Sequence, residues 1–163
     1  MNKQLSPNEL KQKIIGFLRE HKEGSLATCM NNIPRSSPVQ YFLGDDLNIY
    51  IQSAGGEKFN AIRQNPNVCL LVNTEYINYR KIKGVQIFGT ATTSLDDERL
   101  FAEALRHCPE PWLMNSEGNK LNIIKIVPTE IVYLDSLQDG DRTKQILKQD
   151  QVLIKEDRIP AMV

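Results

Sequence analysis

Residues 35–58, RSSPVQYFLGDDLNIYIQSAGGEK, combine cations, hydroxyls and glycines at a spacing that suits the binding of an anion. Two strand-like runs joined by a Gly-Asp-Asp turn predict a hairpin, which brings Arg35 toward Ser53 and Lys58. A phosphate monoester requires charge-assisted hydrogen bonds from Arg and Lys, and free amides such as those at Gly55-Gly56 before a helix. These residues therefore predict a phosphate site. The alternative is that they are ordinary strand-end charges on a solvated rim.

Other residue types that carry chemistry are few and scattered. Cys29, Cys69 and Cys108 lie far apart without a CxxC spacing, so they are interpreted as small core residues rather than metal ligands or disulfides. His21 and His107 are the only histidines, and no metal site is expected. No residue stands out as a general acid or base, so the sequence assigns no catalytic residue.

The composition limits the class of protein and its partners. A chain of 163 residues predicts one domain with a substantial core. Its 20 Lys and Arg equal its 20 Asp and Glu, which argues against nucleic acid or an anionic membrane as the main partner and leaves self-association unopposed by net charge. No apolar run approaches the roughly 20 residues of a membrane span. The polar N-terminus lacks a signal-peptide pattern, so a cytoplasmic location is expected.

The elements that must position the phosphate site are short strands. A helix is expected from Ser6-Pro7 to about residue 22, ended by Gly24. Pro38 indicates an edge position or a bulge in its strand, and Gly89 indicates a bulge or a close approach. Strands are further predicted at residues 25–30, 67–73, 84–94 and 121–135, and helices at 55–66 and 96–106. The pattern predicts a mainly β fold, an antiparallel barrel of six or seven strands with short helices. Residues 1–135 would form this domain and residues 136–163 a C-terminal extension that is part of the same domain or a contact of a dimer. This extension is expected to add an edge strand at 152–154 or to form a tail that reaches a partner subunit.

The order GSLATCMNNIPRSSPVQYFLGDDLNIYIQSAGGEKFNAIRQNPNVCLLVN, followed by KGVQIFGTATTS, resembles the FMN-binding split-barrel proteins related to pyridoxamine 5′-phosphate oxidase. The resemblance covers about residues 8–135. It implies FMN as the cofactor, with an Arg and backbone groups from one strand, small polar residues from the next, a basic residue at a helix start and a Gln from a later strand. At the matching positions stand Arg35, Ser36, Ser37, Pro38, Val39, Gln52, Ser53, Lys58 and Gln86.

The same resemblance implies a homodimer with FMN at the subunit interface, in which Gln86 can serve the partner's cofactor. The implied activity is an oxidoreductase that uses a nicotinamide donor to reduce flavin or a small-molecule acceptor. A non-catalytic flavin-binding or haem-binding protein of the same fold is the alternative. Two departures matter: Glu57 stands where many relatives have Arg before the Lys, and the Trp-, Arg- and His-rich C-terminal segment of the true oxidases is absent. Genuine pyridoxamine 5′-phosphate oxidation is therefore not expected.

Overall fold

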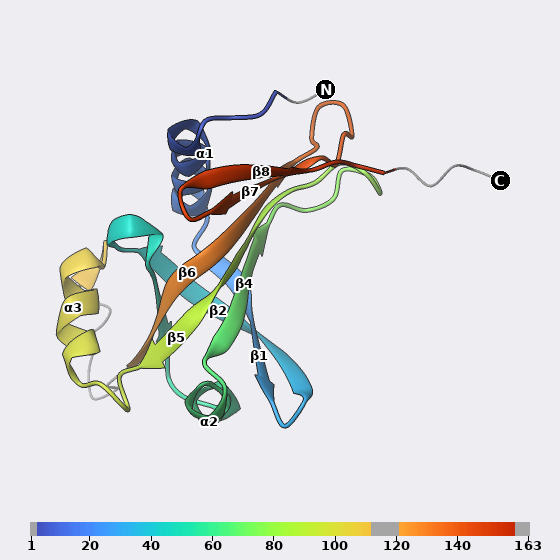
Figure 1. Cartoon of the computed structure of the whole chain (residues 1–163). Coiled ribbons are helices and arrows are strands. Elements are labelled where there is room, and N and C mark those ends of the chain that lie inside the picture. Colours follow the sequence, from blue (N-terminus) through green and yellow to red (C-terminus); the bar gives the residue numbers. More distant parts are fainter. Residues whose placement is uncertain (1–2, 112–120, 159–163) are drawn as a thin grey trace.

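The computed structural model describes residues 3–111 and 121–158 (Figure 1). In these residues the chain forms eight strands, three α-helices and one short 3-10 helix. The strands are β1 (Glu23–Met30), β2 (Ile33–Leu43), β3 (Ile49–Ser53), β4 (Asn67–Asn73), β5 (Lys83–Thr93), β6 (Asn122–Asp135), β7 (Lys144–Lys148) and β8 (Gln151–Lys155). The helices are α1 (Pro7–Glu20), α2 (Glu57–Gln64), α3 (Arg99–His107) and the 3-10 helix η1 (Asp45–Leu47).

Six of the strands close into a barrel. They follow the order β3-β2-β1-β4-β5-β6, every neighbouring pair is antiparallel, and β3 pairs with β6 to complete the ring. This confirms the predicted mainly β fold and antiparallel barrel. The ring is incomplete beside β2, because β3 pairs with it only from Gln40 to Leu43. In the described chain, the earlier part of β2 therefore has a partner strand on its β1 side alone.

A bulge in β6 redirects that strand from one partner to another. Phe88 of β5 pairs with Glu130 and the next residue, Gly89, pairs with Pro128, which leaves Thr129 as the extra residue. Before the bulge β6 pairs with β3, and after it with β7. A side chain at Gly89 would put its Cβ 2.5 Å from the carbonyl oxygen of Val127, so this close approach requires glycine. Both alternatives predicted for Gly89 are thus found together.

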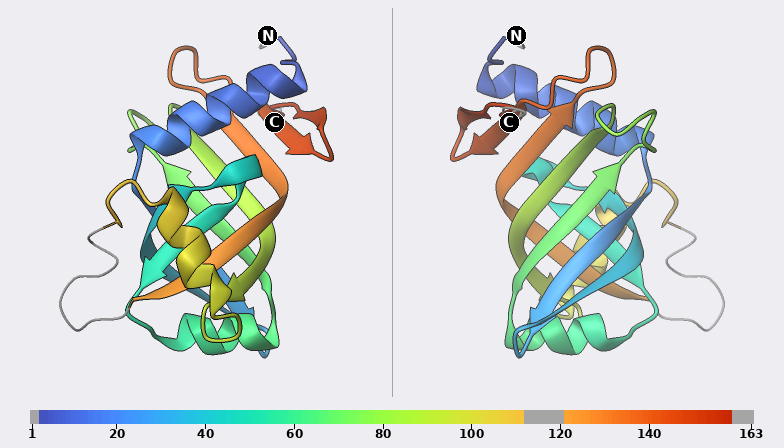
Figure 2. Two further views of the ribbon diagram at one scale, coloured as in Figure 1. Left: turned by 90° about the vertical axis from the view of Figure 1, so that its left-hand side faces the viewer. Right: turned by 90° about the vertical axis from the view of Figure 1, so that its right-hand side faces the viewer.

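The helices cover the two ends and one side of the barrel (Figure 2). At the start of α1, Ser6 and Glu9 form the expected capping box, with hydrogen bonds of 3.2 and 2.8 Å. The predicted helix end was wrong: α1 stops at Glu20, and Gly24 already lies in β1, where a Cβ would meet the Leu71 carbonyl oxygen at 2.7 Å. No helix within the described residues is long and apolar enough to cross a membrane.

The C-terminal segment continues the sheet beyond the barrel. The expected edge strand at residues 152–154 is confirmed as β8, and β7, which the sequence reading missed, joins it to β6. Leu147 and Val152 belong to the main hydrophobic core. The side-chain oxygen of the buried Gln145 accepts a hydrogen bond of 2.8 Å from the Leu5 amide, which ties this hairpin to the N-terminal segment.

Candidate functional site

Three of the residues predicted to hold a phosphate meet between the end of β3 and the start of α2. The Lys58 ammonium folds back and donates to the Gly55 carbonyl oxygen at 2.8 Å. The Ser53 hydroxyl contacts the same oxygen at 3.1 Å and accepts the Gly55 amide at 3.3 Å. A cation and a hydroxyl thus converge on one loop of small residues, and Lys58 is half-buried there. We call Ser53, residues 54–56 and Lys58 the 53–58 cradle.

The backbone of the cradle depends on its two glycines. Gly55 and Gly56 adopt φ angles of +142° and +112°, values that residues with side chains rarely tolerate. Gly56 is the N-cap of α2 and offers no side-chain oxygen to the first amides of the helix. The Phe59 amide donates to the Gly56 carbonyl oxygen at 3.2 Å, so the amides of Glu57 and Lys58 and the positive end of the helix dipole face the same loop as the Lys58 ammonium. The exposed Glu57 opposes them with one negative charge in the first turn.

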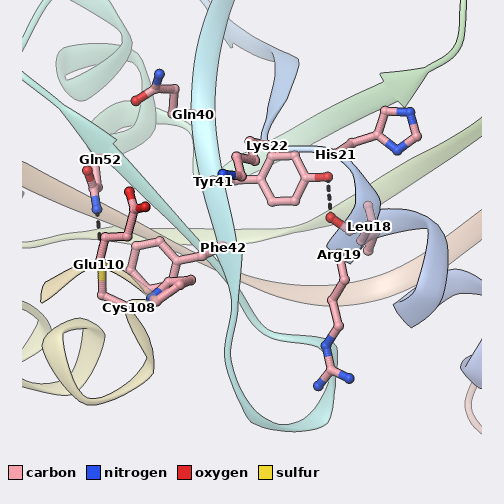
Figure 3. A pocket seen from close by; sticks show the side chains of 11 residues that line it. Leu18, Arg19, His21, Lys22, Gln40, Tyr41, Phe42, Gln52, Cys108 and Glu110 are labelled. Atoms are coloured by element: carbon pink, nitrogen blue, oxygen red, sulfur yellow. Dashed lines mark hydrogen bonds between the residues drawn. The ribbon is translucent and has the colours of Figure 1, made fainter.

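A cavity of about 400 Å³ adjoins the strand pair that leads into the cradle (Figure 3). Gln40 and Gln52 are opposite each other on β2 and β3, and both line it. The Gln52 amide nitrogen donates to the Cys108 Sγ at 3.4 Å, which joins the strand to the end of α3. The aromatic ring of Phe42 and the side chains of Gln52 and Cys108 lie together at one end of the cavity in Figure 3. Because Gln52 precedes Ser53, the cavity and the cradle are neighbours along one strand.

Three further side chains, Tyr50, Glu103 and Lys125, are hydrogen-bonded to one another beside the strand that carries Gln52. Tyr50 is buried, stacks between Phe42 and His107, and donates a hydrogen bond of 2.8 Å to Glu103 on α3. Lys125 contacts the same Glu103 oxygen at 2.5 Å. The hydrogen bond from Lys125 is the largest cause that lowers the pKa of Glu103, and burial raises the pKa of Tyr50. Glu103 is therefore a charged anchor that holds α3 over β3 and β6, rather than a proton donor.

The other predicted residues of β2 lie along its open edge. Arg35 pairs with Thr28 near the β1–β2 turn and is exposed, and its side chain forms no hydrogen bond or ion pair with the described residues. By the β2–β3 register Ser53 is level with Val39, so Arg35 lies about 13 Å further along the strand at roughly 3.3 Å per residue. The structure thus brings Ser53 and Lys58 together but does not join Arg35 to them. The backbone of Ser36, Ser37 and Pro38 follows the stretch that β3 leaves unpaired.

Gln86 lies in a different cavity. It is half-buried on the outer face of β5, paired with Leu71 on β4 and Val132 on β6, and it lines a cavity of about 260 Å³. In one subunit it therefore lies apart from the cavity beside Gln52. Tyr41, which lines the cavity beside Gln52, is buried and donates to the Leu18 carbonyl oxygen at 2.7 Å. The single tryptophan, Trp112, lies outside the described residues.

Sequence reasoning missed Gln40 and Cys108 as lining residues. Cys108 is 56 positions from Gln52, and nothing in a single sequence indicates that a helix end comes back to that strand. Alternation along β2 was the available signal for Gln40, since it shares the outer face with Phe42. Within residues 3–111 and 121–158, no group of three or more His, Cys, Asp or Glu side chains is placed to hold a metal ion.

Comparison with known proteins shows the family of the chain. The sequence profile described as pyridoxamine 5′-phosphate oxidase matches residues 10–135. The chain belongs to the pyridoxamine 5′-phosphate oxidase family. General stress protein 26 of Bacillus subtilis (strain 168) is 29% identical to it over 143 residues, which are 85% of this chain and 96% of that protein. The matched region contains the six strands of the barrel, the 53–58 cradle and the lining of the 400 Å³ cavity, whereas β7 and β8 lie beyond it.

Solved structures share the fold at low identity. A pyridoxamine 5′-phosphate oxidase-related, FMN-binding protein of Nostoc punctiforme matches with a TM-score of 0.62 and 12% identity, over 95% of this chain and 98% of that one. A haem-binding protein of Mycobacterium smegmatis matches with a TM-score of 0.59 and 14% identity, over 96% of this chain and 60% of that one. At such identities the likeness shows the split-barrel fold, and the ligand of each is a property of that protein.

Proposed function

We propose that this chain binds FMN and is an oxidoreductase that passes electrons from a nicotinamide donor to flavin or a small acceptor. The observation that carries the proposal is the 53–58 cradle. There a lysine ammonium, a serine hydroxyl and the uncapped start of a helix meet around two glycines of positive φ. This donor set suits the terminal phosphate of FMN, which needs cationic and amide donors without bulky side chains in between.

The residues next to the cradle suit the rest of the cofactor. The unpaired edge of β2 presents backbone donors and acceptors between Arg35 and Val39, and Gln52 lies one residue before Ser53. The flavin ring would lie along this edge, with the cavity beside Gln40 and Gln52 available to a substrate. FMN supplies the hydride and electron chemistry when bound, and the protein supplies position and hydrogen bonds. The Gln52–Cys108 hydrogen bond and the contact between Glu103 and Lys125 hold α3 in place beside the cavity.

We also propose a homodimer formed through the outer face of β1, β4 and β5. No described helix lies over these strands, which face the viewer in the right-hand view of Figure 2. Two adjacent rows of paired residues cross them, one through Ala27, Cys69 and Phe88, the other through Leu71 and Gln86. Phe88 and Leu71 are 38% and 36% exposed, unusual for large apolar residues in the middle of a sheet. Such a dimer would set Gln86 beside the partner's cofactor.

The test is the colour and redox behaviour of the purified protein. The proposal predicts flavin absorbance, released by heat as FMN, and bleaching of that absorbance by NADH or NADPH in the absence of oxygen. Flavin that is bound but never reduced by a nicotinamide would leave a non-catalytic flavin-binding protein. A Soret band with no flavin would replace FMN by haem, and a colourless protein that takes up neither would contradict the cofactor proposal altogether.

A further inference from the structure

A groove of about 460 Å³ lies beside α1, between the turn at residues 43–47 and the turn that joins β7 to β8. In the left-hand view of Figure 2, α1 crosses the upper part of β6 with the β7–β8 hairpin at its side. None of the residues that line the groove belongs to the 53–58 cradle or to β1, β4 and β5, the strands of the proposed dimer contact. We call this surface the α1 groove.

One wall of the α1 groove is a stretch of β6 that lacks a partner on one of its edges. On the edge that faces away from β5, β6 pairs with β3 at residues 122–126 and with β7 at residues 131–134. In the described chain no strand pairs with residues 127–130 on this edge, and Pro128 to Ile131 line the groove. Backbone groups without a partner strand are free to bind another molecule. Because Pro128 has no N–H, the stretch offers more acceptors than donors.

Positive and negative side chains lie on different walls of the groove. On α1, Lys11 and Arg19 line it about 12 Å apart, at roughly 1.5 Å of helix per residue. Lys11 is engaged, since its ammonium contacts the Asp150 carboxylate at 2.5 Å. The exposed Arg19 forms no side-chain hydrogen bond or ion pair with the described residues. The same holds for the two acids of the other walls, Glu130 on β6 and Asp46 in the 43–47 turn.

Glu130 is the least ordinary of these unpaired groups, because it is half-buried. A carboxylate that is partly withdrawn from water is costly unless a cation or hydrogen-bond donors satisfy it. The apolar part of the lining includes Ile15 of α1 and Leu43 of β2, which are partly buried against the main core. The groove thus combines acceptors for a cationic group, an arginine for an anionic group and an apolar surface. These three features complement a zwitterion with an apolar body.

We propose that the α1 groove binds a short free peptide with apolar side chains. Its terminal ammonium meets Glu130, and its terminal carboxylate meets the Arg19 guanidinium, which can donate two parallel hydrogen bonds to it. The backbone between them runs along the unpaired edge of residues 127–130, as peptides do when they add to an open sheet edge. The 12 Å between Lys11 and Arg19 accommodates about three or four extended residues at roughly 3.3 Å each.

The experiment measures binding of the tripeptide Leu-Ala-Leu to the purified full-length chain by calorimetry. Acetylation of its amino end or amidation of its carboxyl end should each weaken binding by about tenfold or more, because a charge-assisted hydrogen bond is lost. Arg19→Gln should bind the free acid and the amide equally, and Glu130→Gln should bind the free and the acetylated peptide equally.

Two comparisons assign the binding to this groove. Arg19 also lines the 400 Å³ cavity, whereas Glu130 does not, so a loss of binding in Glu130→Gln distinguishes the two places. The matched control for Arg19 is Lys13→Gln, because Lys13 lies on the same helix, is exposed and does not line the groove. The control should bind the free tripeptide as tightly as the wild type does.

Thermal unfolding gives a second readout that a merely structural glutamate would not produce. Without peptide, Glu130→Gln should melt at the wild-type temperature or above it, because a half-buried carboxylate without a partner is removed, and the tripeptide should raise its melting temperature less. The proposal is overturned if the tripeptide does not bind at millimolar concentration, if the acetylated form binds as tightly as the free form, or if both variants bind like the wild type. Free leucine that binds as tightly as the tripeptide would also overturn it, since a peptide backbone would then contribute nothing.

Discussion

Gly89 offers the sharpest test of how the barrel is built. A Cβ at this position would lie 2.5 Å from the Val127 carbonyl oxygen, 2.8 Å from Ile126 Cγ2 and 3.1 Å from Pro128 Cα. Two of these atoms belong to the backbone at the β6 bulge, so Gly89→Ala must push the strand away rather than rotate a side chain. Overpacking of this kind costs about 1–3 kcal/mol, and the free energy of unfolding should fall by about 2 kcal/mol.

Gly16 provides the opposite result from the same substitution. It lies within α1, and nothing comes within 4 Å of its Cβ position. Gly16→Ala should therefore raise the free energy of unfolding by about 0.5–1 kcal/mol, the gain expected when glycine is replaced in a helix. The free energy of unfolding of both variants can be measured in urea. An unchanged dependence of that free energy on urea concentration would show that the variants and the wild type undergo the same transition. If Gly89→Ala is as stable as the wild type, the close approach at the bulge is not the constraint described.

Two other predictions concern charges around the site. Glu57→Gln should tighten FMN binding severalfold, because a like charge near the phosphate at the surface costs about 0.5–1 kcal/mol. The same substitution should slightly lower the free energy of unfolding of the protein without FMN, because an acidic residue at the start of a helix is lost. Unchanged affinity in a flavin-fluorescence titration would contradict a phosphate at the start of α2. The Glu103→Gln variant should be less stable than the wild type near neutral pH. Because Lys125 lowers the pKa of Glu103 below its ordinary 4.5, this contribution is complete above that pH and is lost as pH falls through the lowered value. Unfolding curves of both proteins should therefore converge in acid, and a constant difference at every pH would refute the charged anchor.

The barrel was predictable because its signals are local. Alternation in residues 35–53 and the capping box at Ser6 each report a backbone requirement that is close in sequence. Where the reading failed, the deciding contact was distant. Gly24 indicated a helix end, yet it is required by the approach of the β4 backbone, and β7 is too short and charged to be recognised without its partner β6.

The candidate site shows the same division. Ser53, the glycines and Lys58 are close in sequence, so the cradle could be predicted from their order alone. The cavity could not, because Cys108 reaches Gln52 only through the packing of α3 on the outside of the barrel. The hairpin was predicted, but its register was not, because the sequence leaves the register open. In the observed register Arg35 lies about four residues along β2 from the position that is level with Ser53.

The most direct test of the central claim compares FMN with riboflavin, which lacks the phosphate. In the wild type FMN should bind much more tightly, and Lys58→Ala should weaken FMN binding roughly ten- to hundredfold, as expected for a charge-assisted hydrogen bond of about 1.5–3 kcal/mol. Riboflavin affinity should stay the same, and Lys13→Ala, an exposed lysine on α1, should change neither. Equal loss for both flavins, or no loss for FMN, would contradict a phosphate held by the 53–58 cradle.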